Sequence, residues 1–229
     1  MGSRMILIVE SGATKGDWRV ISPSGEESAR FLAGGTNVST MTADAVRRII
    51  TETSEKIAAS GYDIEKIWFY TAGIPTSEAK KLLTGTFKTV FPDASIEIDD
   101  DLTAAARATC GHKKGIAAIL GTGSNSCLYD GKRITANVSP LGFILGDEGS
   151  GAVLGRHLLG LLLKDMLPTS LKEAFLDQYS LTPTDIIEKV YRQPQPNRFL
   201  ASLVPFIHSH RHTEGIHRLL TEQFTLFLT

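Results

Sequence analysis

The sequence predicts an α/β protein of two lobes, because one local pattern occurs near the start of each half of the chain. In the first half, the apolar run 5–9 leads into a turn of small and polar residues, 10–17, and β-type residues follow at 18–21. In the second half, the buried-strand pattern 115–120 leads into the glycine turn 121–126, after which a strand resumes. The repetition of strand, tight turn and strand indicates two similar lobes.

The composition is that of a globular protein with a hydrophobic core. The 229 residues are 42% hydrophobic and 21% charged, with a net charge of −1, so no basic excess indicates a nucleic-acid partner. No apolar run reaches membrane-spanning length, and no signal-peptide pattern occurs. Cys110 and Cys127 are too few for a disulfide framework and lack metal-ligand spacing, which favours a reducing, cytoplasmic compartment.

The rest of the first half alternates strands and helices. Hydrophobic periodicity predicts strands over 28–33, 66–71 and 95–98, a helix capped by Thr42, and a second helix over 77–90. A meander followed by alternating helices and strands is typical of a mixed sheet flanked by helices.

Three acidic residues follow the last of these strands. Asp99 and Asp100 are interpreted as part of an ordinary solvated turn. Asp101 immediately precedes the small-residue helix 103–108, and the dipole of that helix favours an ionised carboxylate near neutral pH. A carboxylate in this place could accept the proton of a reacting hydroxyl group.

Both glycine turns have the size and composition of a phosphate site. Small residues at 11–13 let main-chain N–H groups point into the first turn, and Glu10 could hold a hydrated Mg²⁺ beside the phosphates. An ordinary hairpin explains this first turn equally well. The second turn does not fit a dinucleotide-binding fingerprint, because β-type residues follow its glycines, and the sequence contains no P-loop motif. The two turns together suggest two lobes that face one nucleotide.

The remainder of the second half is predicted to be mainly helical. Asp147 and Glu148 precede the first of these helices and could simply be capping acids. The histidines between the last two helices favour a solvated segment over a metal site. A hairpin turn is expected at 130–131, and helices are expected over 151–164, 184–192, 197–208 and 214–228.

Four segments, 10–17, 101–106, 120–126 and 142–151, resemble in the same order the N-acetylglucosamine kinases. That family belongs to the BadF/BadG/BcrA/BcrD-type ATPases of the actin and hexokinase superfamily. The resemblance covers the chain from about Met5 to its end. It implies a two-lobed, ribonuclease H-like (actin-like ATPase) fold with mixed five-stranded sheets flanked by helices and a nucleotide in the cleft between the lobes. The implied lobes are residues 5–104 and 105–229, the second incomplete at its C-terminal end.

The resemblance also implies a function: ATP-dependent transfer of a phosphate to an N-acetylated amino sugar, first of all to the 6-hydroxyl of N-acetylglucosamine. Asp101 would be the catalytic base, and Glu10 would bind Mg²⁺. A small-molecule amino sugar would be the partner of a homodimeric enzyme. The implied ATP-binding residues are Gly12, Thr14, Lys15, Gly121, Thr122 and Gly123, and the implied sugar-binding residues are Asn37, Asp101, Gly142 and Asp147.

Two positions depart from the pattern of the family, and two other functions are compatible with it. Glu10 stands where the family commonly has Asp, and Gly16 stands where Thr commonly follows the Lys. The family commonly continues with a Gly-rich adenosine-binding segment beyond the point where this sequence stops. Either the sequence is part of a longer protein, or the nucleotide pocket has lost this part, and the second case makes a non-catalytic sugar sensor one alternative. The other is an activator ATPase of the 2-hydroxyacyl-CoA dehydratase or benzoyl-CoA reductase type, which needs cysteines for an iron–sulfur cluster.

Overall fold

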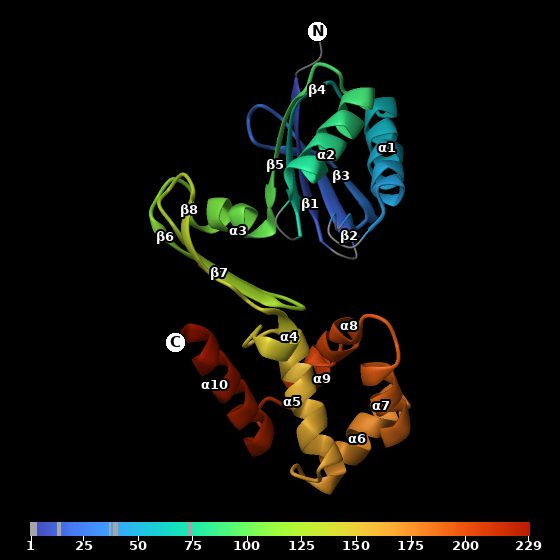
Figure 1. The fold of residues 1–229 in the computed structure, drawn as a ribbon, viewed down its shortest axis with the longest axis vertical. Coiled ribbons are helices and arrows are strands. Elements are labelled where there is room, and N and C mark those ends of the chain that lie inside the picture. The colour runs from blue at the N-terminus through green and yellow to red at the C-terminus, as the bar shows by residue number, and fades with distance from the viewer. Residues whose placement is uncertain (1–3, 13–14, 37, 39–40, 73–74) are drawn as a thin grey trace. The chain divides into compact units, whose positions relative to one another are not determined.

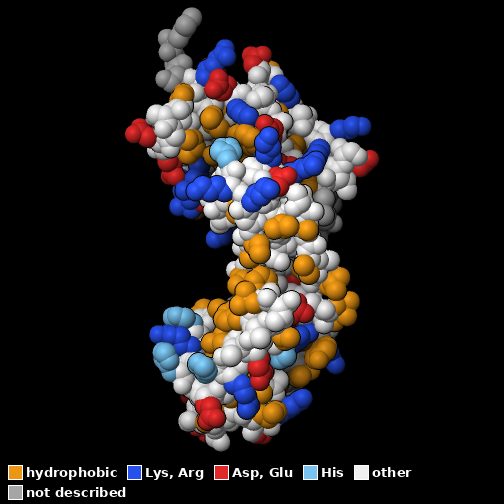
Figure 2. All heavy atoms as spheres, turned by 90° about the vertical axis from the view of Figure 1, so that its left-hand side faces the viewer, with side chains coloured by type: hydrophobic (Ala, Val, Ile, Leu, Met, Phe, Trp, Pro, Cys, Tyr) orange, Lys and Arg blue, Asp and Glu red, His pale blue; other side chains and the backbone are white. Residues whose placement is uncertain are grey.

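The computed structural model describes residues 4–12, 15–36, 38, 41–72 and 75–229 (Figure 1). The chain forms two compact units, residues 1–112 and residues 113–229. Figure 2 shows acidic and basic side chains interspersed over one face of both units, as expected for a net charge of −1. No helix in the described ranges is long and apolar enough to cross a membrane.

The first unit is built on a mixed five-stranded sheet with the strand order β3-β2-β1-β4-β5. The antiparallel meander β3-β2-β1 continues into parallel pairs of β1 with β4 and of β4 with β5. The carboxyl ends of β1, β4 and β5 therefore lie at the same edge of the sheet. The strands are β1 (Met5–Ser11), β2 (Lys15–Ile21), β3 (Glu27–Gly34), β4 (Ile64–Thr71) and β5 (Ser95–Asp100).

Two helices, α1 (Ala43–Ala59) and α2 (Ser77–Val90), cover one face of this sheet (Figure 1). As predicted, Thr42 is the N-cap of α1, and its hydroxyl accepts a hydrogen bond from a main-chain N–H of the first turn. A third helix, α3 (Asp101–Cys110), begins directly after β5.

Three aromatic side chains form the centre of the core between the sheet and the helices. Trp18 and Phe69 come from the sheet and Phe87 from α2, and all three are fully buried. Their ring centroids lie 5.5 to 6.5 Å apart in tilted or edge-to-face arrangements. The other face of the sheet carries charged and half-buried aromatic side chains, which leaves it available for polar contacts.

The second unit combines a small sheet with several helices. Its sheet contains three antiparallel strands, β6 (Gly115–Leu120), β7 (Ser124–Tyr129) and β8 (Ile134–Val138), in the described part of the chain, where five were expected. The helices are α4 (Gly142–Leu145), α5 (Gly151–Leu163), α6 (Thr169–Tyr179), α7 (Pro183–Tyr191), α8 (Pro196–Ala201), α9 (Val204–Ser209) and α10 (Glu214–Leu228).

One predicted helix is wrong in its extent. The segment 197–208 forms two short helices, α8 and α9, instead of one. Pro205 at the start of α9 has no N–H to donate to the carbonyl of Ala201, and its ring would clash with that carbonyl in a continuous helix. The chain therefore breaks between the two helices.

Helix α5 packs closely against α8 at Gly155. A Cβ atom at this position would overlap the main-chain carbonyl oxygen of Leu200. At Gly160, on the same helix, an added Cβ would meet no atom within 4 Å. The two glycines thus differ in packing although both lie in one helix.

We predict opposite effects of alanine at these two positions. Gly155→Ala should lower the free energy of unfolding by about 1–3 kcal/mol, because the extra methyl group forces α5 and α8 apart. Gly160→Ala should raise it by about 0.5–1 kcal/mol, because alanine has the higher helix propensity and the site is open. Urea unfolding of both variants measures the difference, and equal stabilities would contradict the proposed close approach.

Candidate active site

A network of buried hydroxyl groups lies at the edge of the sheet where β1 and β4 end. The Ser11 Oγ atom lies 2.7 Å from Thr36 Oγ1 and accepts a hydrogen bond of 2.8 Å from the Thr36 N–H. The Thr71 hydroxyl donates to the Thr36 carbonyl at 3.0 Å. All three side chains are at most 1% exposed, so the network fixes the segment after β3 against the ends of two strands.

The sequence analysis missed these three residues. Ser11 and Thr71 are the last residues of β1 and β4, and they are paired in the parallel register. Polar residues that end adjacent parallel strands are the signal that could have found them. Asn37, a predicted sugar ligand, directly follows Thr36 in the sequence and is outside the described residues.

The acidic segment at the end of β5 is ordered by specific contacts. Asp99 and Asp100 belong to β5, so their interpretation as a solvated turn is wrong. The Asp99 carboxylate lies 3.1 Å from the Arg107 guanidinium group. Asp100 is the N-cap of α3, and its Oδ1 atom accepts a 2.7 Å hydrogen bond from the Thr103 N–H. Both carboxylates at this strand end therefore have partners on α3.

Asp101 is the first residue of α3 and points its carboxylate back to the helix start, where Oδ1 accepts a 3.0 Å hydrogen bond from the Leu102 N–H. Burial and, secondly, the negative charge of Asp100 raise the pKa of Asp101 above its usual value. The helix start alone would lower the pKa, as the sequence analysis expected, but burial dominates. A raised pKa makes this carboxylate a stronger proton acceptor.

Glu10 lies close enough to Asp101 for the two charges to interact. Burial raises the pKa of Glu10, the charges of Asp101 and Asp17 raise it further, and Lys15 opposes the shift. The positive charge of Lys15 does not offset the burial and the neighbouring carboxylates, and a bound cation would add compensating charge. The described residues include no cluster of three or more His, Cys, Asp or Glu side chains that fits a metal ion. A single carboxylate such as Glu10 can hold Mg²⁺ only together with phosphate oxygens and water.

The first glycine turn is closed by its own backbone. The N–H of Gly12 donates a 3.0 Å hydrogen bond to the Lys15 carbonyl, so it is engaged within the turn. Lys15 is exposed at the start of β2, and its positive charge acts on Glu10. Thr14, the other predicted phosphate ligand of this turn, is outside the described residues.

The unusual Gly16 has a packing explanation. A Cβ atom here would lie 2.9 Å from Trp18 Nε1, closer than real Cβ contacts, so the buried indole ring occupies the space of a side chain. The indole N–H has no hydrogen-bond partner within the described residues. The glycine thus accommodates the core tryptophan directly below the turn.

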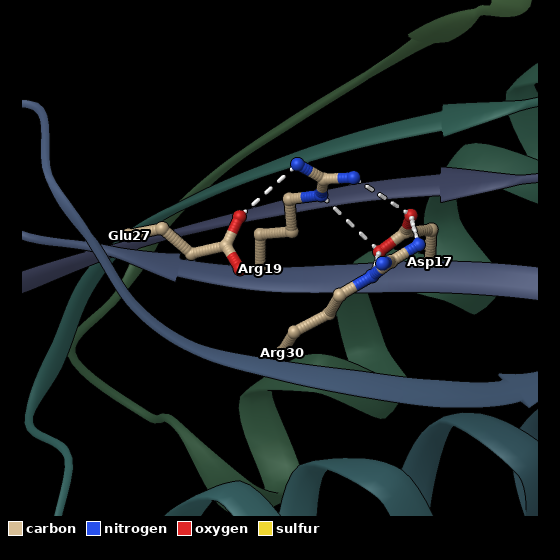
Figure 3. A network of polar contacts seen from close by, with 4 residues as sticks. All are labelled: Asp17, Arg19, Glu27 and Arg30. Carbon is tan, nitrogen blue, oxygen red and sulfur yellow. Dashed lines mark hydrogen bonds and ion pairs between the residues drawn. The ribbon is translucent and has the colours of Figure 1, made fainter.

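Asp17 lies opposite Glu10 in the β1–β2 pair. Its pKa is lowered, whereas that of Glu10 is raised. Figure 3 shows its carboxylate between the guanidinium groups of Arg30 and Arg19, with Glu27 on the far side of Arg19. The closest contacts are 2.6 Å to Arg30 and 3.1 Å to Arg19. Hydrogen bonds from Arg30 and then Arg19 lower the pKa of Asp17 to about 2. Asp17 therefore stays negative and contributes to the raised pKa of Glu10.

This network predicts a specific dependence on pH. Because the pKa of Asp17 falls from 3.8 to about 2 on folding, its ionised form stabilises the fold above the unfolded-state pKa, and that contribution is lost as the pH falls through 2. In a carboxyl NMR titration, Arg30→Gln should move the midpoint of Asp17 upward, whereas Arg47→Gln, on α1, should not. A wild-type midpoint near 3.8 would contradict the network.

The second glycine turn is attached to the start of α5. The Gly121 N–H donates to the Gly123 carbonyl at 2.8 Å, and the carbonyls of Gly121 and Thr122 accept hydrogen bonds from Gly151 and Ala152. Among the described residues, no acceptor engages the N–H groups of Thr122 and Gly123. These two groups can therefore donate to an anionic oxygen.

Asp147 lies beside this second turn. Its side chain is buried, its Oδ1 atom accepts a long, 3.4 Å hydrogen bond from the Ser124 N–H, and a Cβ atom on Gly123 would lie 2.9 Å from its Oδ2 atom. Burial raises the pKa of Asp147. Gly142 is exposed at the start of α4, and its carbonyl accepts a hydrogen bond from Gly146. The structure thus brings Asp147, but not Gly142, into contact with the turn.

The comparison with known proteins identifies the family. Residues 9–219 match the BadF/BadG/BcrA/BcrD ATPase family. The chain belongs to this ATPase family. A solved structure from Porphyromonas gingivalis, provisionally named an N-acetylglucosamine kinase, is 47% identical with a TM-score of 0.89 and aligns over 98% of this chain and 79% of that one. The predicted family and actin-like fold class are thereby confirmed.

Two more distant relatives carry related names. The chain is 24% identical over 215 residues to the N-acetylmuramic acid/N-acetylglucosamine kinase of Clostridium acetobutylicum, which covers 90% of this chain and 70% of that protein. It is 26% identical over 210 residues to the N-acetyl-D-glucosamine kinase of Dictyostelium discoideum, over 83% of this chain and 66% of that protein. The chain thus spans about two thirds of the length of these two relatives.

Proposed function

We propose that this protein is an ATP-dependent sugar kinase. It transfers the γ-phosphate of ATP to the 6-hydroxyl group of an N-acetylated amino sugar, with N-acetylglucosamine as the first candidate. Membership of an ATPase family supports the use of ATP, and the names of three relatives support an amino-sugar acceptor.

The observation that carries the proposal is the position of Asp101 and Glu10 at one edge of the same sheet. The two residues are far apart in the sequence, but parallel strands bring them to one edge of the sheet, and each has a raised pKa. The charge of Asp101 is itself one cause of the shift at Glu10. A proton acceptor beside a site for a cation is the arrangement that phosphoryl transfer to a hydroxyl group requires.

In the proposed reaction, the Asp101 carboxylate accepts the proton of the sugar hydroxyl as the hydroxyl oxygen attacks the γ-phosphorus. The bond between that phosphorus and the bridging oxygen breaks, and ADP leaves with the electron pair. In the first unit, Lys15 neutralises phosphate charge, the Thr14 hydroxyl donates a hydrogen bond to a phosphate oxygen, and Asn37 orients the sugar. Mg²⁺, when bound at Glu10, would neutralise further charge on the phosphates.

In the second unit, the N–H groups of Thr122 and Gly123 bind phosphate oxygens, and Asp147 binds a sugar hydroxyl. The close approach of Asp147 to Gly123 supports these two roles, because the sugar hydroxyl and the γ-phosphate must lie next to each other during transfer. Most of the rate acceleration then comes from positioning and charge neutralisation.

The alternative of an activator ATPase is less well supported by the cysteines. Cys127 is only 3% exposed within β7, and Cys110 is partly buried at the end of α3. A cluster shared between subunits needs accessible thiolates. Cys127 is inaccessible in the described conformation, which leaves the single partly exposed thiol of Cys110.

We predict that Asp101→Asn nearly abolishes phosphate transfer, by about 10²–10⁴-fold in kcat, because the amide cannot accept the proton. Sugar affinity should remain within about tenfold, since the amide retains the hydrogen-bonding shape of the carboxylate. In the wild type, kcat/KM should fall on the acid side at a pH above 3.8, since the pKa of Asp101 is raised. Coupled measurement of ADP release against sugar concentration gives both constants.

Asp44 of α1 provides the matched control. Its side chain is 94% exposed, so Asp44→Asn makes the same chemical change at the protein surface. Its kinetics should equal those of the wild type. Full turnover by the Asp101→Asn variant would remove Asp101 from the mechanism.

A further inference from the structure

Helix α3 carries Asp101 but has little apolar surface to hold it in place. Of its ten residues, only Leu102 and Ala106 are buried. Only one of these two side chains, that of Leu102, is large. Helix α1, in contrast, buries Val46, Ile50 and Ile57 among others. We therefore expect polar contacts to contribute to the orientation of α3 on the sheet.

Arg107 provides these contacts. Its Nη1 atom donates a 3.1 Å hydrogen bond to the Tyr70 hydroxyl and lies 3.1 Å from the Asp99 carboxylate. Its guanidinium carbon lies 4.8 Å from the ring centroid of Trp68 and 5.8 Å from that of Tyr70. The two rings stack at an interplanar angle of 11°. One side chain thus links α3 to both β4 and β5 by an ion pair, a hydrogen bond and cation–π contacts.

We propose that Arg107 is a positioning residue of the kinase: by clamping α3 to β4 and β5, it holds the Asp101 carboxylate where proton transfer occurs. This inference rests on the proposed function of Asp101. Among the described residues, α3 is also attached by the Asp100 cap, which fixes its first turn. Arg107 lies six residues beyond Asp101, roughly 9 Å along the helix axis, and so supplies the second point that defines the direction of the helix.

Arg107 acts on Asp101 by fixing the position of α3, and its charge does not shift the pKa of Asp101. The pKa of Asp101 is shifted by its burial, by Asp100 and by main-chain N–H groups, and Arg107 is not among the causes. The positive charge of Arg107 is instead directed at Asp99 and Tyr70. Loss of the clamp should let α3 pivot about its capped end, and a misplacement of about 1 Å at a reacting group can lower the rate about 10²-fold.

The sheet offers a matched control in Lys66. Its Nζ atom lies 4.1 Å from the ring centroid of Trp68 and 3.0 Å from the Glu97 carboxylate, so it makes the same two kinds of contact as Arg107. Lys66 belongs to β4 and Glu97 to β5, so this ion pair lies within the sheet; it shares the Trp68 ring and the Glu97 charge with Arg107 but not Asp99 or Tyr70. Lys66→Met therefore removes an ion pair and a cation–π contact while leaving the contacts of Arg107 with Asp99 and Tyr70 in place.

The test compares Arg107→Met, Arg107→Ala and Lys66→Met by steady-state kinetics with Mg-ATP and N-acetylglucosamine. Arg107→Met should lower kcat about 10–100-fold with the KM for ATP within about twofold, and Lys66→Met should change kcat less than about twofold. Added guanidinium should restore several-fold activity to Arg107→Ala, because the planar ion can refill the site between Asp99 and Trp68. Hydrogen exchange should accelerate over residues 101–110 in the Arg107 variants alone.

The outcomes separate this inference from the function on which it rests. A wild-type protein without sugar-dependent ADP release would overturn the proposed function and the positioning role with it. An active wild type in which Arg107→Met keeps its kcat, or loses no more than Lys66→Met does, would overturn the positioning role alone. Unchanged exchange in α3 would do the same, because the helix would then not depend on the clamp.

Discussion

The parallel pairing of β1, β4 and β5 determines the arrangement of the candidate site. In this register the last residues of the strands, Ser11, Thr71 and Asp100, form one row, and the preceding residues form a second row. Because side chains alternate between the two faces of a sheet, the first row contributes the buried hydroxyl groups and the helix cap, and the second row faces the open side. A shift of one residue in either pair would exchange the two rows and remove the site.

The carboxylates around this edge fall into two electrostatic classes. Asp17 is enclosed by two guanidinium groups, so its low pKa marks a structural ion pair. Glu10 and Asp101 have raised pKa values and no arginine among the causes of their shifts. Uncompensated carboxylates in a folded protein lower its stability, and they are typical of sites that bind a cation or move a proton. This contrast supports a functional role for Glu10 and Asp101 more strongly than their positions in the sequence do.

The sequence predicted the features that depend on local patterns. The strands, the Thr42 cap and the order of elements in the first unit follow from hydrophobic periodicity and capping preferences, and the position of Asp101 at a helix start was also predicted. Features that depend on distant partners were missed. The charge of Asp99 could not be interpreted without Arg107, nor the Ser11 hydroxyl without Thr36, because these contacts form only when the sheet has folded. The break at Pro205, in contrast, was readable from the sequence and was overlooked.

The most direct test of the proposed function is sugar-dependent ADP release. The purified protein is incubated with Mg-ATP and, in turn, glucose, glucosamine, N-acetylglucosamine, N-acetylmannosamine and N-acetylmuramic acid. The proposed function predicts turnover restricted to one or more N-acetylated sugars, with N-acetylglucosamine among them, and a product phosphorylated at the 6-hydroxyl group. A folded protein that releases no ADP with any of these sugars would contradict it.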